Sequence, residues 1–443
     1  VSGGWRVSEE AFWKVNPDLF SNLKIRASYG SLGNGNVSPY SFLELLSIST
    51  SGRVLNGLKN KYTSAPAVMP DGLTWETATT TDVGLDFGML NNRLQFNGDY
   101  YIRKTTDMYT VGETLPDVFG ASSPKGNYAD MTTKGWEITL TWRDQFTLAE
   151  KPFNYEIRGT LSDYISTIDR YNNQTGNLDD YYAGKRVGEI WGYVTEGLFK
   201  DQADIDSHAD QTLIQSSSKR ITYPGDVKIK DLNGDHVIDY GNNTVDDHGD
   251  KTVIGNALPR YAYSINLSGD WNNFFLSAFF QGVGKQDWYP SSECIFWGQY
   301  NRPYNNMPTW HQGNYWTEDN TDAYLPRYAG YNASLKSTPQ TRYLQNVAYI
   351  RLKNLQFGYT LPQPIVSKAK LQNVRVYISA ENLWCWSPLY KHTRDLDVTN
   401  IYGSDPDLTD ADMSSGLNGN RGSGDGNSYP QMKSVSLGLS VTF

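Results

Sequence analysis

Strict alternation of apolar and polar residues constrains the fold of this chain more than any other feature. The last ten residues, "SVSLGLSVTF", place Val435, Leu437, Leu439, Val441 and Phe443 on one face and small or polar residues on the other. A period of two residues is the signature of a β-strand with one apolar face. The pattern recurs in "RLQFNGDYYIRK", "GWEITLTWR", "NYEIRGTLSD", "RYAYSINLSG" and "NVRVYISAEN". No helical pattern of comparable length competes, so the sequence predicts an all-β fold.

In one further predicted strand, the alternation of apolar and polar residues shifts by one position. In "YIRLKNLQFGYTL" the apolar residues lead up to Leu352 and then resume at Leu355, which shifts them to the other parity. A β-bulge adds one residue to one strand and so restores the facing of the side chains that follow. We therefore predict a bulge near Lys353–Asn354.

The connections between the predicted strands are very unequal. Some strands meet across a few residues, as at 90–93 and 269–273, whereas long segments cover 166–259, 284–348 and 384–433. Structureless loops of that length are uncommon in compact soluble domains. Short turns at one end and long loops at the other are typical of outer-membrane barrels. The sequence therefore predicts a transmembrane antiparallel β-barrel whose three long segments are extracellular, the last of them Gly-rich.

The predicted strands do not complete a barrel. Counting from both ends of the chain gives about eleven membrane strands, half of the roughly 22 in a plugged transporter. We therefore interpret residues 1–443 as the C-terminal part of a larger receptor barrel. The chain also lacks a start methionine and a signal peptide, as expected for the later part of a longer protein.

Composition fits a membrane interface better than a soluble enzyme. Aromatic residues make up 14% of the chain, although only 38% of all residues are hydrophobic. Amphipathic rings suit an interface or a stacked ligand. The sequence contains no run of about 18 apolar residues, so no membrane-spanning helix is predicted. The net charge of -9, without any basic block, gives no electrostatic basis for nucleic-acid binding.

Ordered motifs extend along nearly the whole chain. They include "GWRVSEE", "LKIRASYGSLGN", "LTWETATTTDVGLDFGMLNNRLQFNGDYYIRKTTDMY", "GNYADMTTKGWEITL", "PGDVKIKDLNGDHVID", "YWTEDNTDAYLPR", "YIRLKNLQFGYTLP" and "VRVYISAENLW". In these motifs the sequence resembles the SusC/RagA-like TonB-dependent outer-membrane transporters of Bacteroidota. The terminal strand ending in Phe443 also resembles the signal by which the barrel-assembly machinery recognises its clients.

The resemblance implies a location, an activity and partners. The expected location is the bacterial outer membrane, in contact with its lipid, and the expected activity is active import of an oligosaccharide. Peptide import by the same architecture is the alternative. A SusD-like lipoprotein is expected to cover the extracellular loops, and TonB to supply energy through an N-terminal part that these residues do not contain.

The segment "DLNGDHVID" predicts a cation site. Oxygen donors at alternate positions are typical of an EF-hand-like loop around a hard cation such as Ca²⁺. His236 stands where such a loop needs Gly, and Asn242 where it needs a bidentate Glu, so a later acid has to close the site. The alternative is a turn that needs no ion. The predicted ligands are Asp231, Asn233, Asp235, Val237 through its carbonyl, Asp239 and, among the later acids Asp246, Asp247 and Asp250, Asp247.

Two further sets of residues are candidates for substrate binding. The aromatic segment 284–348 carries Trp288, Trp297, Trp310 and Trp316, whose flat rings suit sugar faces. The alternative is that these rings pack the segment against itself or against the lid protein. Arg375 and Glu381 lie on the predicted inward face of their strand, where they could contact cargo or anchor a plug.

Enzyme signatures are missing from the sequence. The five His residues lie in predicted loops without metal-type spacing, and there is no Gly-x-Ser-x-Gly motif. No catalytic residue is predicted. The sequence is also compatible with a structural or adhesive barrel that transports nothing, and with a soluble carbohydrate-binding sandwich.

Overall fold

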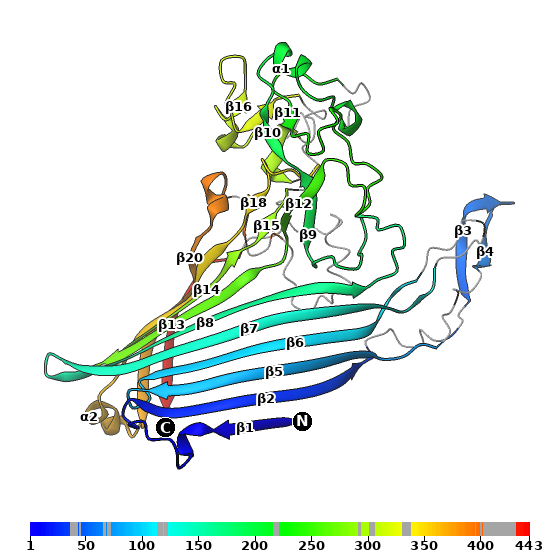
Figure 1. Cartoon of the computed structure of the whole chain (residues 1–443). Coiled ribbons are helices and arrows are strands. Elements are labelled where there is room, and N and C mark those ends of the chain that lie inside the picture. The colour runs from blue at the N-terminus through cyan, green and yellow to red at the C-terminus, as the bar shows by residue number, and fades with distance from the viewer. Residues whose placement is uncertain are drawn as a thin grey trace.

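One large antiparallel sheet organises the molecule. Its eleven strands follow the order β1-β2-β5-β6-β7-β8-β13-β14-β19-β20-β21, which confirms the predicted all-β fold (Figure 1). No helix among the described residues is both long and apolar enough to cross a membrane. The computed structural model describes residues 1–35, 43, 46–64, 68, 72–112, 118, 123–215, 221–290, 294–300, 306–329, 338–394, 396–398, 401 and 431–443.

The sheet strands are joined by short turns at one end and by long excursions at the other. Turns at Leu90–Arg93, Ala149–Glu150 and Asn272–Asn273 use residues with positive φ, mainly Asn, which tolerates that conformation. The strands are β1 (Ser2–Arg6), β2 (Phe20–Asn34), β5 (Glu76–Met89), β6 (Leu94–Val111), β7 (Lys125–Leu148), β8 (Lys151–Arg170), β13 (Arg260–Trp271), β14 (Phe274–Lys285), β19 (Tyr349–Thr360), β20 (Asn373–Trp386) and β21 (Ser434–Thr442).

The predicted bulge is present. Relative to β14, β19 advances two residues, from Leu352 to Asn354, where β14 advances one, so Lys353 is the extra residue, as predicted. The pairing of β19 with β20 shifts at the same place, where β20 has one residue more than β19 between Glu381 and Trp384. After the bulge, Leu355 and Phe357 share a face with the apolar residues of both neighbouring strands.

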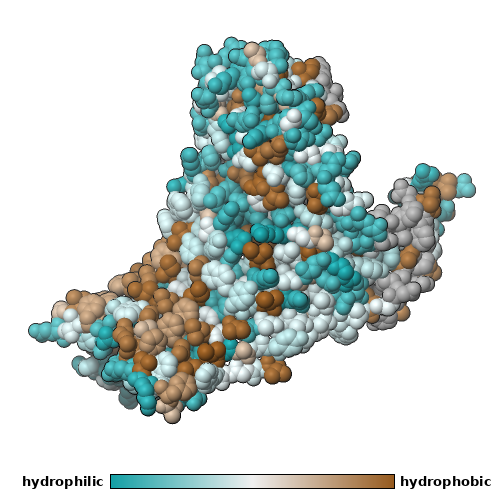
Figure 2. All heavy atoms as spheres, viewed as in Figure 1, coloured by the Kyte–Doolittle hydropathy of each residue, from teal (hydrophilic) through white to brown (hydrophobic). Residues whose placement is uncertain are grey.

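The two faces of the sheet differ as the alternation predicts. One face presents large apolar side chains that are exposed, for example Leu140 at 45%, Leu276 at 48% and Leu437 at 78%. A soluble protein would bury such a face. Figure 2 shows hydrophobic residues gathered over the lower part of the sheet and hydrophilic ones over the top of the molecule.

The other face carries ion pairs and small residues. Arg26 on β2 contacts Asp86 on β5 at 2.8 Å and reaches Asp99 on β6 at 2.9 Å. It crosses above Gly84, where a Cβ would lie 2.7 Å from the guanidinium carbon of Arg26. Glycine is therefore required there by the close approach of the ion pair.

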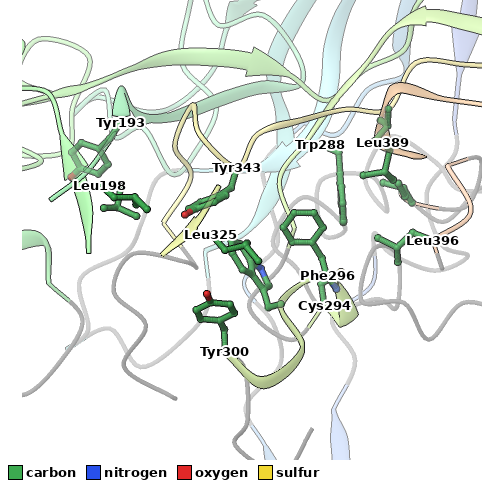
Figure 3. Packing of buried hydrophobic residues seen from close by; sticks show 14 of the residues in the cluster. Tyr193, Leu198, Trp288, Cys294, Phe296, Tyr300, Leu325, Tyr343, Leu389 and Leu396 are labelled. Carbon is green, nitrogen blue, oxygen red and sulfur yellow. Dashed lines mark hydrogen bonds between the residues drawn. The ribbon is translucent and has the colours of Figure 1, made fainter. Parts of the chain in front are cut away.

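The buried core lies outside the sheet, in the excursions. We define the cap as the described residues of 171–259, 286–348 and 387–401. Its hydrophobic cluster joins all three segments through residues such as Tyr193, Phe296 and Leu389, each 2% exposed or less (Figure 3). Because β8 runs to Arg170, β14 to Lys285 and β20 to Trp386, the excursions begin a few residues later than the sequence predicted.

Short elements shape the cap and the remaining connections. The first excursion contains β9 (Glu189–Tyr193), β10 (Thr195–Leu198), α1 (Gln202–Asp206), β11 (Val227–Ile229) and β12 (Lys251–Asn256). The second contains β15 (Asp287–Trp288), β16 (Tyr315–Trp316), β17 (Leu325–Arg327) and β18 (Gln345–Asn346). Elsewhere lie the hairpin β3 (Ser47–Leu55) and β4 (Leu58–Ser64) and the helix α2 (Gln363–Val366). Single 3₁₀ turns cover Val7–Glu9, Thr212–Ile214, Ile295–Tyr300, Thr309–His311, Ser367–Ala369 and Pro388–Lys391.

A buried ion pair fastens the third excursion to the sheet. Arg351 on β19 donates to the Asp397 carboxylate at 2.6 Å, and the two side chains are 6% and 10% exposed. Asp397 also accepts from the backbone N–H of Gln431 at 3.1 Å, and Arg351 contacts the Gln431 side chain. Arg351 therefore clamps both ends of the segment between residues 398 and 431.

We expect removal of this clamp to be costly. Arg351→Ala leaves the Asp397 carboxylate buried without its cation, which should destabilise the base of the excursion by about 3–5 kcal/mol. Arg143→Ala is the matched control, because its pair with Glu156 is half exposed and should contribute about 1 kcal/mol or less. Hydrogen exchange of residues 387–398 measures the difference. Equal protection of residues 387–398 from hydrogen exchange in the two variants would contradict the proposed role of Arg351 in stabilising the excursion.

Candidate functional site

An aromatic belt surrounds the short-turn end of the sheet on its apolar face. Phe87 and Phe96 stack at 4.7 Å between ring centroids, Phe146 and Phe153 lie 5.0 Å apart, and Phe274 contacts both Phe357 and Tyr359. Trp271 donates from its indole to the Leu148 carbonyl at 2.9 Å. Rings with a polar edge concentrate at the boundary between lipid and water. The belt therefore has the composition of a membrane interface.

The opposite face of the sheet forms a polar wall. Lys24, Asp82, Arg103, Glu137 and Arg158 all point to this face, and none of them makes an ion pair with a residue that the structure describes. Unpaired charges are tolerated only next to water or a polar partner. The wall is therefore suited to an aqueous lumen.

Arg375 and Glu381, the predicted inward residues, lie on this wall. The guanidinium of Arg375 stands 4.5 Å from the centroid of the Phe275 ring. Glu381 accepts from the Ser434 hydroxyl at 3.4 Å, a weak contact with the last strand. Both side chains are exposed, so contact with a ligand stays a prediction.

The cation loop is held by its own backbone. Asp231 accepts from the amides of Gly234 at 2.6 Å and His236 at 3.0 Å, and Asp235 accepts from that of Val237. His236 has φ +66°, the conformation for which an EF-hand-like loop uses Gly. Among the described residues, no three acidic, His or Cys side chains converge as a metal cluster. The Asp231 and Asp235 hydrogen bonds are those of an Asx-type turn, and cation binding stays a prediction.

Of the later acids, Asp250 is the one that accepts hydrogen bonds from the loop backbone, and ligation of a cation by Asp247 stays a prediction. The Asp250 carboxylate is fully buried and accepts from the amides of Leu232 at 2.7 Å and Asp239 at 3.0 Å. Asp247 instead accepts from Asn242, at the exposed end of the turn. In the sequence Asp250 is only one of several later acids, and its burial depends on contacts eleven and eighteen residues away.

The four tryptophans of the aromatic segment have different surroundings. Trp297 is 0% and Trp288 is 3% exposed, so neither ring has surface for a ligand and packing is the alternative that holds for both. Trp297 packs edge-to-face on Tyr343, with 5.2 Å between centroids. Trp310 and Trp316 are partly buried at the edge of the cluster. Ligand contact therefore stays a prediction for these two alone.

His311 is a buried histidine at the centre of the cap. Its Nε2 lies 2.9 Å from the Phe296 carbonyl, and its Nδ1 lies 2.5 Å from the Tyr328 hydroxyl. This arrangement fits a neutral ring that donates to the carbonyl and accepts from the hydroxyl. Burial lowers the pKa of His311 to about 4. Burial likewise raises the pKa of the neighbouring Tyr300 and Tyr328 hydroxyls well above the usual range.

Ion pairs and ring contacts tie the excursions together. Asp226, 1% exposed, receives Arg327 at 2.7 Å, which joins the first excursion to the second. Tyr324 stacks on His392 at 4.6 Å between centroids, which joins the second to the third. Sequence reasoning missed these pairs because their members lie 101 and 68 residues apart. The only local signal was an acid between Gly225 and the alternating "VKI".

The chain is similar along its whole length to curated TonB-dependent receptors. It is 27% identical to "TonB-dependent receptor P26" and 28% identical to "TonB-dependent receptor P3", both of Formosa agariphila, over 100% and 99% of this chain and 42% and 41% of those proteins. It is 23% identical to "TonB-dependent receptor SusC" of Bacteroides thetaiotaomicron, over 99% of this chain and 39% of that one. The chain thus spans about two fifths of the length of these relatives, each of which is named a receptor rather than an enzyme.

Solved structures show the same fold. "Structure of the RagAB peptide transporter" matches with a TM-score of 0.67 at 19% identity, covering 100% of this chain and 43% of that one. The RagAB peptide importer in its "closed-closed" state matches with a TM-score of 0.70 at 18% identity and the same coverage. No family model matches the chain. The resemblance to the SusC/RagA-like TonB-dependent transporters is confirmed.

We expect the cap to lose stability in acid. An unfolded histidine protonates near pH 6.5, whereas buried His311 does so only near pH 4, so protons favour the unfolded cap as the pH falls between these values. The loss should reach roughly 3 kcal/mol at pH 4. Hydrogen exchange of the cap between pH 7.5 and 4 measures it.

Two variants are compared. His311→Gln should abolish the loss of cap stability in acid that comes from this histidine, whereas His236→Asn, in the exposed turn, should leave that loss unchanged. An identical pH dependence in the wild type and in His311→Gln would contradict the assignment.

The cation prediction is tested by calorimetric titration of CaCl₂ into the purified protein. The sequence pattern predicts one saturable site that disappears when Asp231→Asn and Asp235→Asn are combined. Lack of saturable binding in the wild type would rule out the site and leave the ion-free turn.

Proposed function

We propose that this chain forms part of the wall and the extracellular cap of a TonB-dependent outer-membrane importer of oligosaccharides. The observation that carries the proposal is an eleven-stranded antiparallel sheet with an exposed apolar face and a polar opposite face. Backbone groups in lipid have to be satisfied within the protein, which closed barrels achieve. The names of the relatives, TonB-dependent receptors, support the same assignment.

The orientation follows from the two ends of the sheet. Outer-membrane barrels have short turns in the periplasm and long loops outside the cell. The short turns at Ala149–Glu150 and Asn272–Asn273 would then face the periplasm, beside the aromatic belt. The cap would project from the cell surface, where it meets cargo first.

The open sheet calls for more strands. β1 and β21 are the edges of the sheet, and each pairs on one side only within the described residues. Val435, Leu437 and Leu439 on β21 are 66–78% exposed. Such edges would be unstable in lipid. We propose that strands from outside these residues close a barrel of roughly 22 strands, and that this part also carries the plug and the contact with TonB.

The proposed partner on the outside is a SusD-like surface lipoprotein that covers the cap. Support comes from the similarity to SusC and from the RagAB fold. The cap carries exposed apolar side chains, Leu213, Ile221 and Tyr223, as well as exposed polar ones. Such mixed surfaces suit a partner that binds and releases.

Oligosaccharides are the proposed cargo, and peptides are the second candidate. The solved RagAB structures are titled a peptide transporter and a peptide importer, which favours the second candidate. The aromatic and hydroxyl-bearing side chains of the inner wall favour the first, because flat rings and hydroxyls match sugar faces and edges. A non-transporting barrel gains no support from the TonB-dependent receptor names of the relatives.

The test is uptake by cells that carry the complete transporter. We expect a labelled oligosaccharide ladder to enter in a manner that needs both the gene and an energised inner membrane, and the protein extracted in detergent to bring a lipoprotein with it. A deletion strain is the control. Uptake that survives deletion of the gene or dissipation of the proton gradient would contradict the proposal, and uptake of peptides alone would assign the second cargo.

A further inference from the structure

The inner wall has two halves of different chemistry. Strands β2 to β8 carry charges of both signs along their inward face. On the register row of Arg351 and below it, strands β2 to β8 carry five inward charges, and below the Arg351 clamp strands β13 to β21 carry three. At this level the inward charged residues of the first half are Lys24, Asp86, Arg143, Glu156 and Arg158, and those of the second half are Asp270, Arg375 and Glu381. Five further inward charges of the first half lie above this level, namely Arg26, Asp82, Asp99, Arg103 and Glu137.

Flat aromatic rings lie on the second half. Register places Phe275, Gly358, Tyr377 and Gly438 in one row across β14, β19, β20 and β21. A Cβ built on Gly358 would lie 2.6 Å from Phe275, and one built on Gly438 would overlap the Tyr377 ring. The two glycines therefore leave room for the rings to lie flat against the wall. We call Phe275 and Tyr377 the ring platform.

The surroundings of the platform suit a neutral polyhydroxylated ligand. Arg375 covers part of Phe275 and makes no ion pair with any described residue, so its N–H donors are available. Register sets Ser379 and Ser436 in the row above and Ser440 in the row below. A flat ring gives a sugar face its stacking partner, and neighbouring hydroxyls and N–H donors meet the edges. A wall with many charged side chains would instead favour a ligand that carries charges of its own.

The ring platform lies near the short-turn end of the sheet. Phe275 is two residues from the short turn at Asn272–Asn273, so the platform is near the proposed periplasmic mouth. The cap rises from the upper ends of β14 and β20, the strands that carry the two rings (Figure 1). Cargo released beneath the cap would therefore meet this half of the wall on its way down.

We propose that neutral oligosaccharides leave the barrel along the less charged half of the inner wall, strands β13 to β21, and stack on the Phe275–Tyr377 platform near the exit. This inference rests on the proposed function and specifies the exit path of its cargo.

The test compares two rings of the same geometry in the complete transporter with its partner. Tyr377→Leu removes a platform ring. Tyr101→Leu removes the matched ring of the charged half, which lies over Gly135. We expect import of a labelled dextrin ladder to slow about fivefold for Tyr377→Leu, the loss expected for one stacking contact, and to stay unchanged for Tyr101→Leu. Tyr377→Phe keeps the ring and should import normally.

Equal amounts of each variant in the outer membrane are verified by immunoblotting. If Tyr377→Leu fails to reach the membrane, Ser379→Asp serves instead, because it adds a charge beside the platform without removing a ring, and it should slow import to a similar extent. Normal import by the platform variant that reaches the membrane, or equal slowing by Tyr101→Leu, would overturn the exit path but leave the importer intact. Import of a mixed hexapeptide library, with no dextrin uptake by the wild type, would overturn the proposed cargo as well.

Discussion

Satisfaction of backbone hydrogen bonds in a water-free layer is the constraint on which the rest of this structure depends. A strand that crosses lipid has to pair on both sides, because each unpaired N–H or C=O would cost several kcal/mol. In this sheet every strand from β2 through β20 pairs with a neighbour on both sides, which meets that demand. Once every strand is paired on both sides, side chains can only alternate between lipid and lumen. The low average hydropathy of the chain follows from this alternation, since every second residue along a strand faces water.

The buried hydrophobic cluster of the described residues lies in the cap and not against a face of the sheet. An ordinary domain buries its apolar residues beneath its sheet. Here the buried side chains of the cluster, among them Tyr193, Trp297 and Leu389, belong to excursions that are far apart in sequence. Their joint burial offsets the conformational entropy of ordering such long segments. This explains why the described parts of these excursions have a defined structure despite the length of the segments.

The sequence was most informative where structure is local. Period two predicted the strands, and a single change of phase located the bulge at Lys353. The cap was less predictable, because its contacts join residues such as Asp226 and Arg327 that lie 101 positions apart. Burial of Trp297 beside Tyr343 could not be predicted, because the sequence did not distinguish it from the other three tryptophans of the segment. Asp250 was one of three equivalent acids until the fold brought the amides of Leu232 and Asp239 to it.

The difference between the two halves of the wall is also a property of register rather than of composition. Alternation reveals which residues point inward, but only pairing shows that Gly358 lies between Phe275 and Tyr377. A side chain at Gly358 or Gly438 would lift the rings into the lumen, whereas glycine lets them lie along the wall. Glycine within a strand lowers its stability, and here an aromatic ring from the neighbouring strand covers the exposed backbone. The same pairing packs each ring against a glycine, so that the rings lie along the wall with Arg375 beside Phe275.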